Sequence, residues 1–475
     1  MGDSMKSERA STSPALDAPA ALSRERWWKQ LNRYHWFVFL VASLAWVFDC
    51  LDQQLFILAR NSAITALSPV GLDPALIKKA GANATAIFVT GWAMGGLVFG
   101  AIGDRVGRAR MLALTILMYS VFTGLSAFAT SVAMFEFFRF LTGLGVGGVF
   151  GLSVALVADG LPDRARPHAL GWLQALSAAG NVAAGLIALF VGWLETFQIK
   201  PGSAWRWMFI IGALPAFLCV FIQMRLKEPE KWVTARAAGR ATGVRFGSYR
   251  ALLGDARWRS RALIGMLLCI SGVIGLWGIG FFSPELINDV IGRALKSEGI
   301  SAEKQAGYRT LWVGLNMIIQ NSGAFAGMLV FTKLASRFGR KPIFAIGYVS
   351  AMLSTMAVFQ FLNQRSDIFW MIPIMGFCQL SLFAGFAIYL PELFPVNLRS
   401  TGTSFCYNVG RFIAAAGPLF MGNLTAWLAS GATTPDQKLQ AFRNACGWMS
   451  AIFLLGLLVL PFAPETRGKP LPEDQ

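Results

Sequence analysis

Long hydrophobic stretches alternate with short polar loops along most of this 475-residue chain. A helix needs about 20 mostly apolar residues to cross the roughly 30 Å hydrocarbon layer of a bilayer. By this criterion the pattern predicts twelve membrane-spanning helices. Their approximate bounds are 36–58, 82–103, 111–130, 132–157, 168–193, 205–224, 259–282, 310–332, 342–361, 367–390, 400–427 and 445–462.

The longest polar interruption falls between the sixth and seventh of these spans. It is rich in arginine and poor in apolar periodicity. The predicted fold class is therefore an all-α membrane protein with two six-helix bundles. Its expected parts are a tail (1–35), a first bundle (36–224), a central loop (225–258), a second bundle (259–462) and a C-terminal tail (463–475).

Composition favours a membrane protein over a soluble one. The chain is 55% hydrophobic and only 14% charged, whereas soluble proteins carry roughly 25% charged residues. Its net charge of +17 would suit a nucleic-acid partner only if the basic residues shared one solvated face. Here hydrophobic stretches separate them, so we expect a lipid bilayer and no nucleic acid as partner. The glycine-rich stretches 91–100 and 143–151 predict close contacts between helices.

The basic residues also orient the predicted spans. Of the 42 Lys and Arg residues, 26 lie in the loops that share a side with both termini and 12 lie in the opposite loops. Excess Lys and Arg remain on the cytoplasmic side of a membrane. We therefore expect a multi-pass protein of the cell (inner) membrane with both termini in the cytoplasm.

Polar motifs recur at an offset of about 233 residues. Residues 103–108 recur as 335–340, Asp159 with Arg166 recurs as Glu392 with Arg399, and Glu228-Pro229-Glu230 aligns with residues 463–465. All lie at predicted cytoplasmic ends of spans, where they could lock two rocking bundles together and release them. The expected cytoplasmic gate comprises Gly103, Asp104, Arg105, Gly107, Arg108, Asp159, Arg166, Arg337, Gly339, Arg340, Glu392 and Arg399.

These motifs resemble those of the major facilitator superfamily, over nearly the whole chain. The loop 103–110 resembles the family's loop between helices 2 and 3, and residues 139–148 resemble its fourth-helix motif. Residues 391–399 and 464–468 are similar to motifs of sugar porters and their organic-acid relatives. The resemblance implies a two-bundle transporter. Ser336 stands where the second-half loop usually carries an acid, which would weaken the lock in that half.

Five ionisable residues inside the spans have no counterpart in the repeat: Asp49, Asp52, Glu136, Arg139 and Arg411. Such residues cost about 2.5–3.5 kcal/mol on insertion scales and are functional candidates by default. At 1.5 Å per residue, Asp49 and Arg139 lie at the same depth. We expect them to form an ion pair that a proton or an anion could break, with Asp52 and Glu136 one turn further out as a proton relay.

The alternatives are that the Asp49–Arg139 pair only pins spans 1 and 4 together, and that Glu136 is merely an acid near the outer headgroups. The segment Asp49-Cys50-Leu51-Asp52 is similar to the Asp-Gly-x-Asp of first helices in aromatic acid:proton symporters, although Cys50 replaces the glycine. That resemblance favours proton coupling.

Arg411 lies about 16 Å along span 11, near mid-membrane. A guanidinium offers a carboxylate a bidentate partner, so we expect Arg411 to anchor an anionic substrate. The alternative is an ion pair with an acid from another span. The segment 407–411, Tyr-Asn-Val-Gly-Arg, resembles span 11 of aromatic acid, sialic acid and monocarboxylate symporters. Other expected substrate contacts are Tyr407, Asn408, Gln53, Asn316, Gln320 and Trp277.

Together these features predict a secondary active transporter of a small organic anion, coupled to protons and functional as a monomer. They predict no enzyme activity, no cofactor and no metal. A sugar or polyol porter and an uncoupled facilitator or exporter remain alternatives. A transporter-like nutrient sensor is a further alternative.

Overall fold

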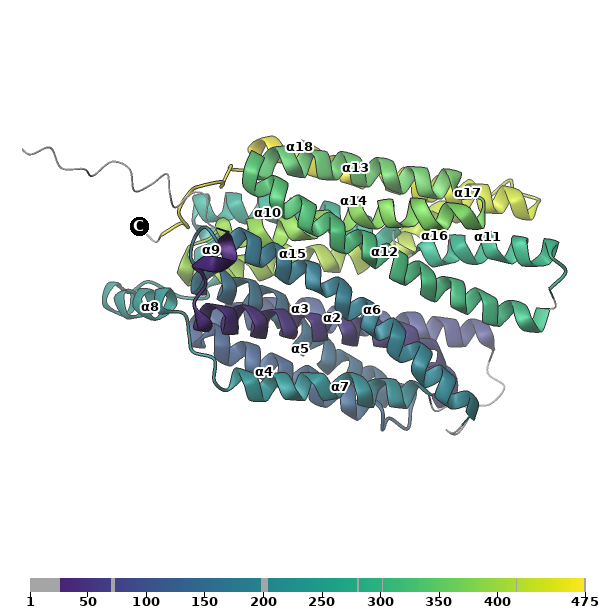
Figure 1. The fold of residues 1–475 in the computed structure, drawn as a ribbon, viewed down its shortest axis with the longest axis horizontal. Coiled ribbons are helices and arrows are strands. Elements are labelled where there is room, and N and C mark those ends of the chain that lie inside the picture. Colours follow the sequence, from purple (N-terminus) through teal and green to yellow (C-terminus); the bar gives the residue numbers. More distant parts are fainter. Residues whose placement is uncertain are drawn as a thin grey trace, which may run out of the picture.

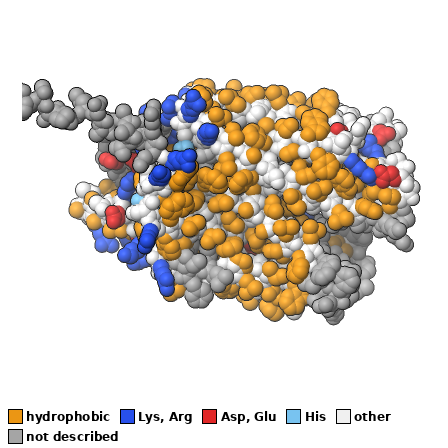
Figure 2. Space-filling model, in the orientation of Figure 1, with side chains coloured by type: hydrophobic (Ala, Val, Ile, Leu, Met, Phe, Trp, Pro, Cys, Tyr) orange, Lys and Arg blue, Asp and Glu red, His pale blue; other side chains and the backbone are white. Residues whose placement is uncertain are grey.

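The structure is a computed structural model that describes residues 26–69, 73–197, 204–279, 282–300, 302–415 and 417–473. In these ranges the regular structure is helical throughout, and the long helices run side by side (Figure 1). Figure 2 shows a broad hydrophobic band around the middle of the molecule, as expected of a surface that faces lipid. Ten helical stretches within the described ranges are long and apolar enough to cross a membrane.

Six long helices form the first half of the molecule. They are α2 (Arg33–Leu67), α3 (Pro74–Val106), α4 (Arg108–Ser126), α5 (Val132–Gly160), α6 (Arg166–Phe197) and α7 (Ala204–Gln223). The second half contains α10 (Ala256–Ile274), α12 (Ala302–Phe338), α13 (Arg340–Phe361), α14 (Arg365–Glu392), α15 (Arg399–Ala415), α16 (Gly417–Leu428), α17 (Pro435–Met449) and α18 (Ile452–Val459).

Every predicted span overlaps one of these helices, so the all-α membrane fold is confirmed. Span 12 consists of two consecutive helices, α17 and α18, rather than one. Span 11 covers α15 and α16, which lie on either side of residue 416, outside the described residues. The shorter elements are η1 (Trp27–Gln30), α8 (Glu230–Thr242), α9 (Tyr249–Gly254), η2 (Gly275–Ile279), α11 (Ser283–Ser297), η4 (Val396–Leu398) and η5 (Leu460–Phe462). Helices α8 and α9 lie in the segment expected to be a loop, and α11 lies in the stretch between spans 7 and 8.

We call the end of the molecule that holds residues 104–108, 225–250, 336–341 and 392–399 the α8 end. Figure 2 shows Lys and Arg side chains gathered at this end of the hydrophobic band. The opposite end, where α11 and α17 lie in Figure 1, we call the far end.

Glycines bring α3 and α5 into backbone contact. A Cβ atom added at Gly95 would lie 1.9 Å from the carbonyl oxygen of Leu144, and one at Gly147 would lie 2.0 Å from that of Trp92. Real Cβ atoms do not approach a carbonyl so closely, so these positions require glycine. The close contact predicted for the two glycine-rich stretches is confirmed.

The two halves meet along α3 with α15 and along α6 with α12. A Cβ added at Gly96 would lie 2.1 Å from the side chain of Asn408 on α15. In the second contact, Asn181 Nδ2 donates a hydrogen bond of 2.8 Å to Asn321 Oδ1. The candidate residues on α15 therefore lie at the interface between the two halves.

Candidate functional site

Arg411 on α15 is held between two aromatic rings at the interface of the halves. Its Cζ lies 3.5 Å from the ring centre of Trp92 on α3 and 4.4 Å from that of Tyr407. Its Nη1 donates a 3.0 Å hydrogen bond to Asn408 Oδ1. The side chain is only 4% exposed, yet its Nε has no hydrogen-bond partner among the described residues. The site thus holds a buried cation with a free donor.

The spacing of α15 explains this arrangement. Tyr407 and Asn408 precede Arg411 by four and three residues, so all three side chains share one face of the helix. Asn408 is held in turn by a 2.9 Å hydrogen bond from its Nδ2 to the carbonyl oxygen of Ser404. Tyr407 stacks on Phe150 of α5, with ring centres 3.9 Å apart. Contacts from both halves therefore fix the guanidinium in place.

Asp49 on α2 is the acid that acts on Arg411. It is fully buried, and its Oδ2 accepts a 2.9 Å hydrogen bond from Gln53 Nε2. Its Oδ1 has no hydrogen-bond partner among the described residues. Arg411 is a basic group close enough to act electrostatically on Asp49. The ion pair expected between Asp49 and Arg139 is not formed among the described residues, because Arg139 lies against Asp52 instead: equal depth in the membrane does not make two side chains face each other.

Arg139 pairs instead with Asp52, the second acid of α2. Arg139 Nη1 lies 3.8 Å from Asp52 Oδ1, and both side chains are fully buried. Thr123 on α4 donates a 2.5 Å hydrogen bond to Asp52. Arg139 donates to the Ser126 hydroxyl through Nε and Nη2, at 3.0 and 2.6 Å. This second pair lies wholly within the first half.

The remaining candidates differ in their burial and contacts. Trp277, in η2, meets Trp92 edge to face with ring centres 5.6 Å apart, so it extends the aromatic wall of the site. Asn316 on α12 is buried, and its Oδ1 has no hydrogen-bond partner among the described residues. Gln320, one turn along α12, is half-buried. Glu136 on α5 is half-buried and forms no ion pair within the described ranges.

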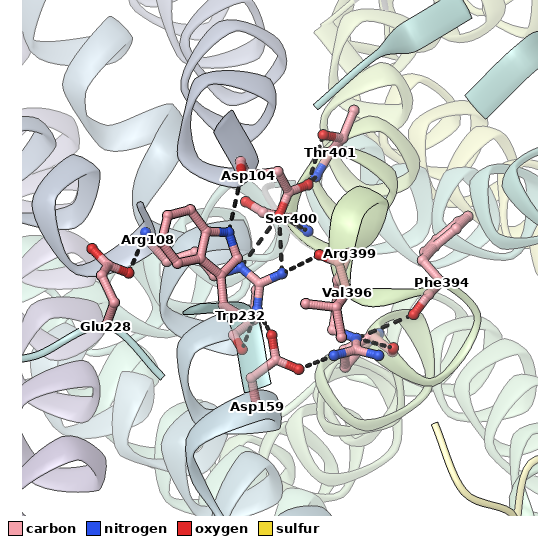
Figure 3. A network of polar contacts seen from close by, with 12 residues as sticks. Asp104, Arg108, Asp159, Glu228, Trp232, Phe394, Val396, Arg399, Ser400 and Thr401 are labelled. Atoms are coloured by element: carbon pink, nitrogen blue, oxygen red, sulfur yellow. Dashed lines mark hydrogen bonds and ion pairs between the residues drawn. The ribbon is translucent and has the colours of Figure 1, made fainter. Parts of the chain in front are cut away.

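A buried polar network ties the halves together at the α8 end (Figure 3). Asp104 at the end of α3 accepts hydrogen bonds from Arg108 Nη2 at 3.0 Å and from the backbone and hydroxyl of Thr401, both at 2.8 Å. Arg108 also pairs with Asp159 at the end of α5. Asp159 pairs in turn with Arg399, the first residue of α15. Four of the expected gate residues therefore form one network that crosses the interface.

The corresponding residues of the second half make a different set of contacts. Arg340 Nη2 lies 2.7 Å from Glu392 Oε1, within that half. Arg166, which was expected to mirror Arg399, pairs with its neighbour Asp163 rather than with Glu392. The Ser336 hydroxyl donates to a carbonyl of its own helix. In the described part of the chain, the ion pair that crosses the interface at this end is Asp159–Arg399.

Two glutamates cap helices at the α8 end. Glu228 accepts from the backbone N–H groups of residues 108–110 at 2.8–3.2 Å, at the start of α4. Glu465 accepts from those of Arg340 and Lys341, each at 3.0 Å, at the start of α13. The structural equivalent of Glu465 is therefore Glu228, so the expected alignment of Glu465 with Glu230 is wrong by two residues.

The capping contacts shift the titration of Glu465. Partial burial alone would raise its pKa, but hydrogen bonds from the backbone N–H groups of residues 340, 341, 466 and 467 outweigh that effect. The pKa of Glu465 is lowered as a result. This carboxylate stays ionised at the start of α13, where the helix dipole favours a negative charge.

The other expected gate residues have local contacts. Gly107 and Gly339 precede the capped helices with φ angles of 132° and 106°, which L side chains rarely adopt. A Cβ added at Gly103 would lie 2.2 Å from the Leu152 side chain. Arg105 bonds to backbone carbonyls of the segment after α8. Arg337 lies over its neighbour Phe338.

The chain is similar to known membrane transporters. The family model for the Major Facilitator Superfamily matches residues 55–418. The chain belongs to the major facilitator superfamily. It is 28% identical to a probable 4-methylmuconolactone transporter of Cupriavidus pinatubonensis, over 93% of either chain. It is 26% identical to a cis,cis-muconate transport protein of Acinetobacter baylyi, over 88% of this chain and 93% of that one.

The fold of this superfamily member also matches a solved structure. The proton:xylose symporter XylE, bound to 6-bromo-6-deoxy-D-glucose, superposes with a TM-score of 0.72 at 19% identity. The match covers 92% of this chain and 98% of that one. At this identity it shows the fold alone. As a member of this superfamily with transporters among its relatives, the chain is a multi-pass membrane transporter rather than an enzyme. No cluster of possible metal ligands occurs among its described residues.

The superfamily resemblance did not reveal every residue of the site. Trp92, whose ring centre lies 3.5 Å from Arg411 Cζ, is not among the predicted site residues, because a tryptophan inside a glycine-rich stretch indicates helix packing. The sequence feature that could have identified Trp92 is its large side chain among small residues, on a helix predicted to contact its neighbours closely. Thr123 and Ser126, which bind the Asp52–Arg139 pair, gave no signal, since hydroxyls in spans usually bond to their own helix.

Proposed function

We propose that this transporter moves a small organic carboxylate together with a proton across the cell membrane. The observation that carries this proposal is the buried Arg411 guanidinium with its unpartnered Nε. A carboxylate can accept two parallel hydrogen bonds from a guanidinium and balance its charge, whereas a neutral sugar cannot balance it. The names of the muconate and 4-methylmuconolactone transporters support this substrate class.

Charge balance supplies the coupling step. With Asp49 ionised, the Asp49–Arg411 group is neutral. If Asp49 takes up a proton, Arg411 is left uncompensated in a buried site, and an anion restores neutrality. Because an unpaired buried charge is costly, the proton and the anion would bind together.

Asp52 and Glu136 serve, in this proposal, as the path of the proton. Asp52 lies three residues beyond Asp49 towards the far end, and Glu136 lies one turn of α5 beyond Arg139 in the same direction. Arg139 would stabilise the ionised form of Asp52 between transfers. The same pair could instead act only as a structural link within the first half.

The gate would be the network at the α8 end. Its ion pairs would hold that end closed while the far end opens, and their release would open it. The excess of Lys and Arg at the α8 end supports a cytoplasmic position for this end and for both termini. We assign transport to the single chain, as a monomer.

Uptake by purified protein in proteoliposomes would test this function. We expect radiolabelled carboxylates, including muconate, to accumulate faster when the outside is acidic, and neutral sugars not to accumulate. Arg411→Gln should abolish this uptake, and Arg411→Lys should weaken it because the fork of donors is lost. Arg259→Gln, an exposed change outside the site, is the control. Uptake of neutral sugars only, without dependence on pH, would refute the proposal.

A further inference from the structure

A cavity open to solvent lies at the α8 end, outside the proposed transport site. Its volume is about 420 Å³. It is lined by Arg105, Arg236, Arg240, Val244, Arg245, Phe246 and Ser248. Four of these seven residues are arginines and none is an acid. Within the described ranges, none of the four arginines forms an ion pair, so their charge is not balanced by the protein.

Two of the arginines are fixed by contacts with neighbouring backbone. Arg105 Nε donates to the carbonyl oxygens of Phe246 and Gly247, at 3.2 and 3.1 Å. Arg236 lies over the Trp232 ring at 4.8 Å, and its Nη1 donates to the carbonyl oxygen of Val106 at 3.4 Å. These contacts hold the guanidiniums at the rim of the cavity and leave other N–H groups of each for a ligand.

The walls of the cavity are anchored to α3. Trp232 on α8 donates a 3.0 Å hydrogen bond from Nε1 to the carbonyl oxygen of Asp104. Gly247, with a φ of 62°, lies so close to α3 that an added Cβ would be 2.0 Å from the Ala101 carbonyl oxygen. The cavity is thus built where the segment that links the halves docks on the first half.

We propose that this cavity binds an anionic phosphate group. Four arginines that line one space make it strongly positive, and an anion bound there would be attracted to all four. Phosphate matches them, because its oxygens accept several charge-assisted hydrogen bonds and guanidiniums bind it bidentately. The phosphate can belong to a membrane phospholipid, since the α8 end borders the hydrophobic band (Figure 2), or to a soluble phosphate compound.

A bound phosphate would strengthen the closed state of the α8 end. It would join Arg236 and Arg240 of α8 to Arg105 of α3. The same segment reaches the second half, because the Gly247 N–H donates a 2.9 Å hydrogen bond to the carbonyl oxygen of Asn397. The ligand would therefore hold the linking segment against both halves. This role does not depend on which solute is transported.

Binding to the purified protein would test the proposal. Phosphatidylglycerol, phosphatidylcholine and inorganic pyrophosphate would each be titrated into protein in a neutral detergent, with bound lipid counted by native mass spectrometry and thermal unfolding followed in parallel. The test variant is Arg236→Gln/Arg240→Gln/Arg245→Gln. The matched control, Arg225→Gln/Arg250→Gln/Arg259→Gln, removes three exposed arginines outside the cavity. If the triple variant does not fold, the single variant Arg240→Gln, at an exposed position, replaces it as the test variant.

We expect saturable binding of one anionic ligand to the wild type and the control, weakened at least about tenfold in the cavity variant. Saturation by phosphatidylglycerol but not by pyrophosphate identifies a lipid headgroup, and the reverse result identifies a soluble phosphate. Equal weakening in the two triple variants, or no saturable binding of either ligand to the wild type, would overturn the proposal.

Discussion

Two fully buried acids lie three residues apart on α2 and have different partners. Asp49 interacts with Arg411 of the second half, whereas Asp52 pairs with Arg139 inside the first half. A buried charge is tolerated only when an opposite charge balances it. The charge of each acid is therefore balanced by a different arginine. In the proposed cycle, rocking of the halves would separate or rebuild the contact between Asp49 and Arg411, while the Asp52–Arg139 pair would move as one body. Asp49 is for this reason the acid that we propose couples a proton to the motion.

Asp49→Asn should separate substrate exchange from proton coupling. The amide is neutral at every pH and so imitates the protonated acid, which leaves Arg411 free to bind an anion. We expect exchange of carboxylate across proteoliposomes without a gradient to persist, and accumulation driven by a pH gradient to fall at least about tenfold. Radiotracer counterflow and gradient-driven uptake measure the two activities. If the variant still accumulates substrate in response to pH, Asp49 is not the coupling acid.

The sequence could identify the charged residues of the site but not how they pair. Insertion cost singles out Asp49, Asp52, Arg139 and Arg411 without any structure. Pairing depends on the rotation of each helix about its axis and on the order of the helices around the interface. Spacing gives depth to within a few ångströms, but it does not say which helix faces which.

At the scale of elements, the close contact between α3 and α5 depends on glycines, which have no side chain. Gly95→Ala would put a methyl group 1.9 Å from the Leu144 carbonyl oxygen. Overpacking of this kind costs about 1–3 kcal/mol or more, so we expect a lower thermal unfolding temperature in detergent. Gly124→Ala on α4 is the control, because its Cβ would meet Ala213 at an ordinary 3.7 Å. An equal effect of the two changes would contradict this account.

The cap on α13 should make stability depend on pH. The pKa of Glu465 lies below its ordinary value of 4.5 in the folded protein. Its stabilising contribution is therefore complete above about pH 4.5 and is lost as the pH falls through the lowered pKa. Glu465→Gln should lower the unfolding temperature near neutral pH, with a difference from wild type that shrinks below about pH 4.5.

Glu473→Gln provides the matched control, since this exposed acid lies in the same C-terminal segment. It should leave the unfolding temperature unchanged at every pH. A difference between Glu465→Gln and wild type that grows on acidification would reverse the sign of the linkage and exclude the capping role.

Hydropathy predicted the long helices well because the bilayer forces every backbone polar group in its core into a hydrogen bond, and a helix satisfies them all. Hydropathy did not predict the shorter helices α8 and α11, because outside the bilayer the backbone polar groups can form hydrogen bonds with water instead. Such helices depend on contacts with the rest of the protein: α8 is fixed to α3 through Trp232. Such contacts are made between distant segments, so no local window of sequence contains them.

At the scale of the whole molecule, the repeated motifs do not give a symmetric gate. The Asp159 side of the interface has an ion pair between the halves. On the other side, Arg340 and Glu392 pair within one half. The duplication predicted equivalent residues, yet their partners differ because Ser336 replaces the acid and Arg166 binds Asp163. Among the described residues, Arg399 is therefore the arginine of the second half that forms an ion pair across the interface at the α8 end.

This asymmetry predicts unequal effects of two arginine substitutions. Arg399→Ala removes the partner of Asp159 across the interface and leaves a buried carboxylate with less compensation, so the α8 end should open more often. Hydrogen–deuterium exchange should rise in the first turns of α15 and at the end of α3, and uptake should slow because closure of this end is part of the cycle. Arg340→Ala, the control, breaks a pair inside one half. It should raise exchange near Glu392 and leave α3 protected. An equal rise in hydrogen–deuterium exchange at the end of α3 in both variants would mean that the two ion pairs contribute equally to closing the α8 end, which would contradict the predicted asymmetry.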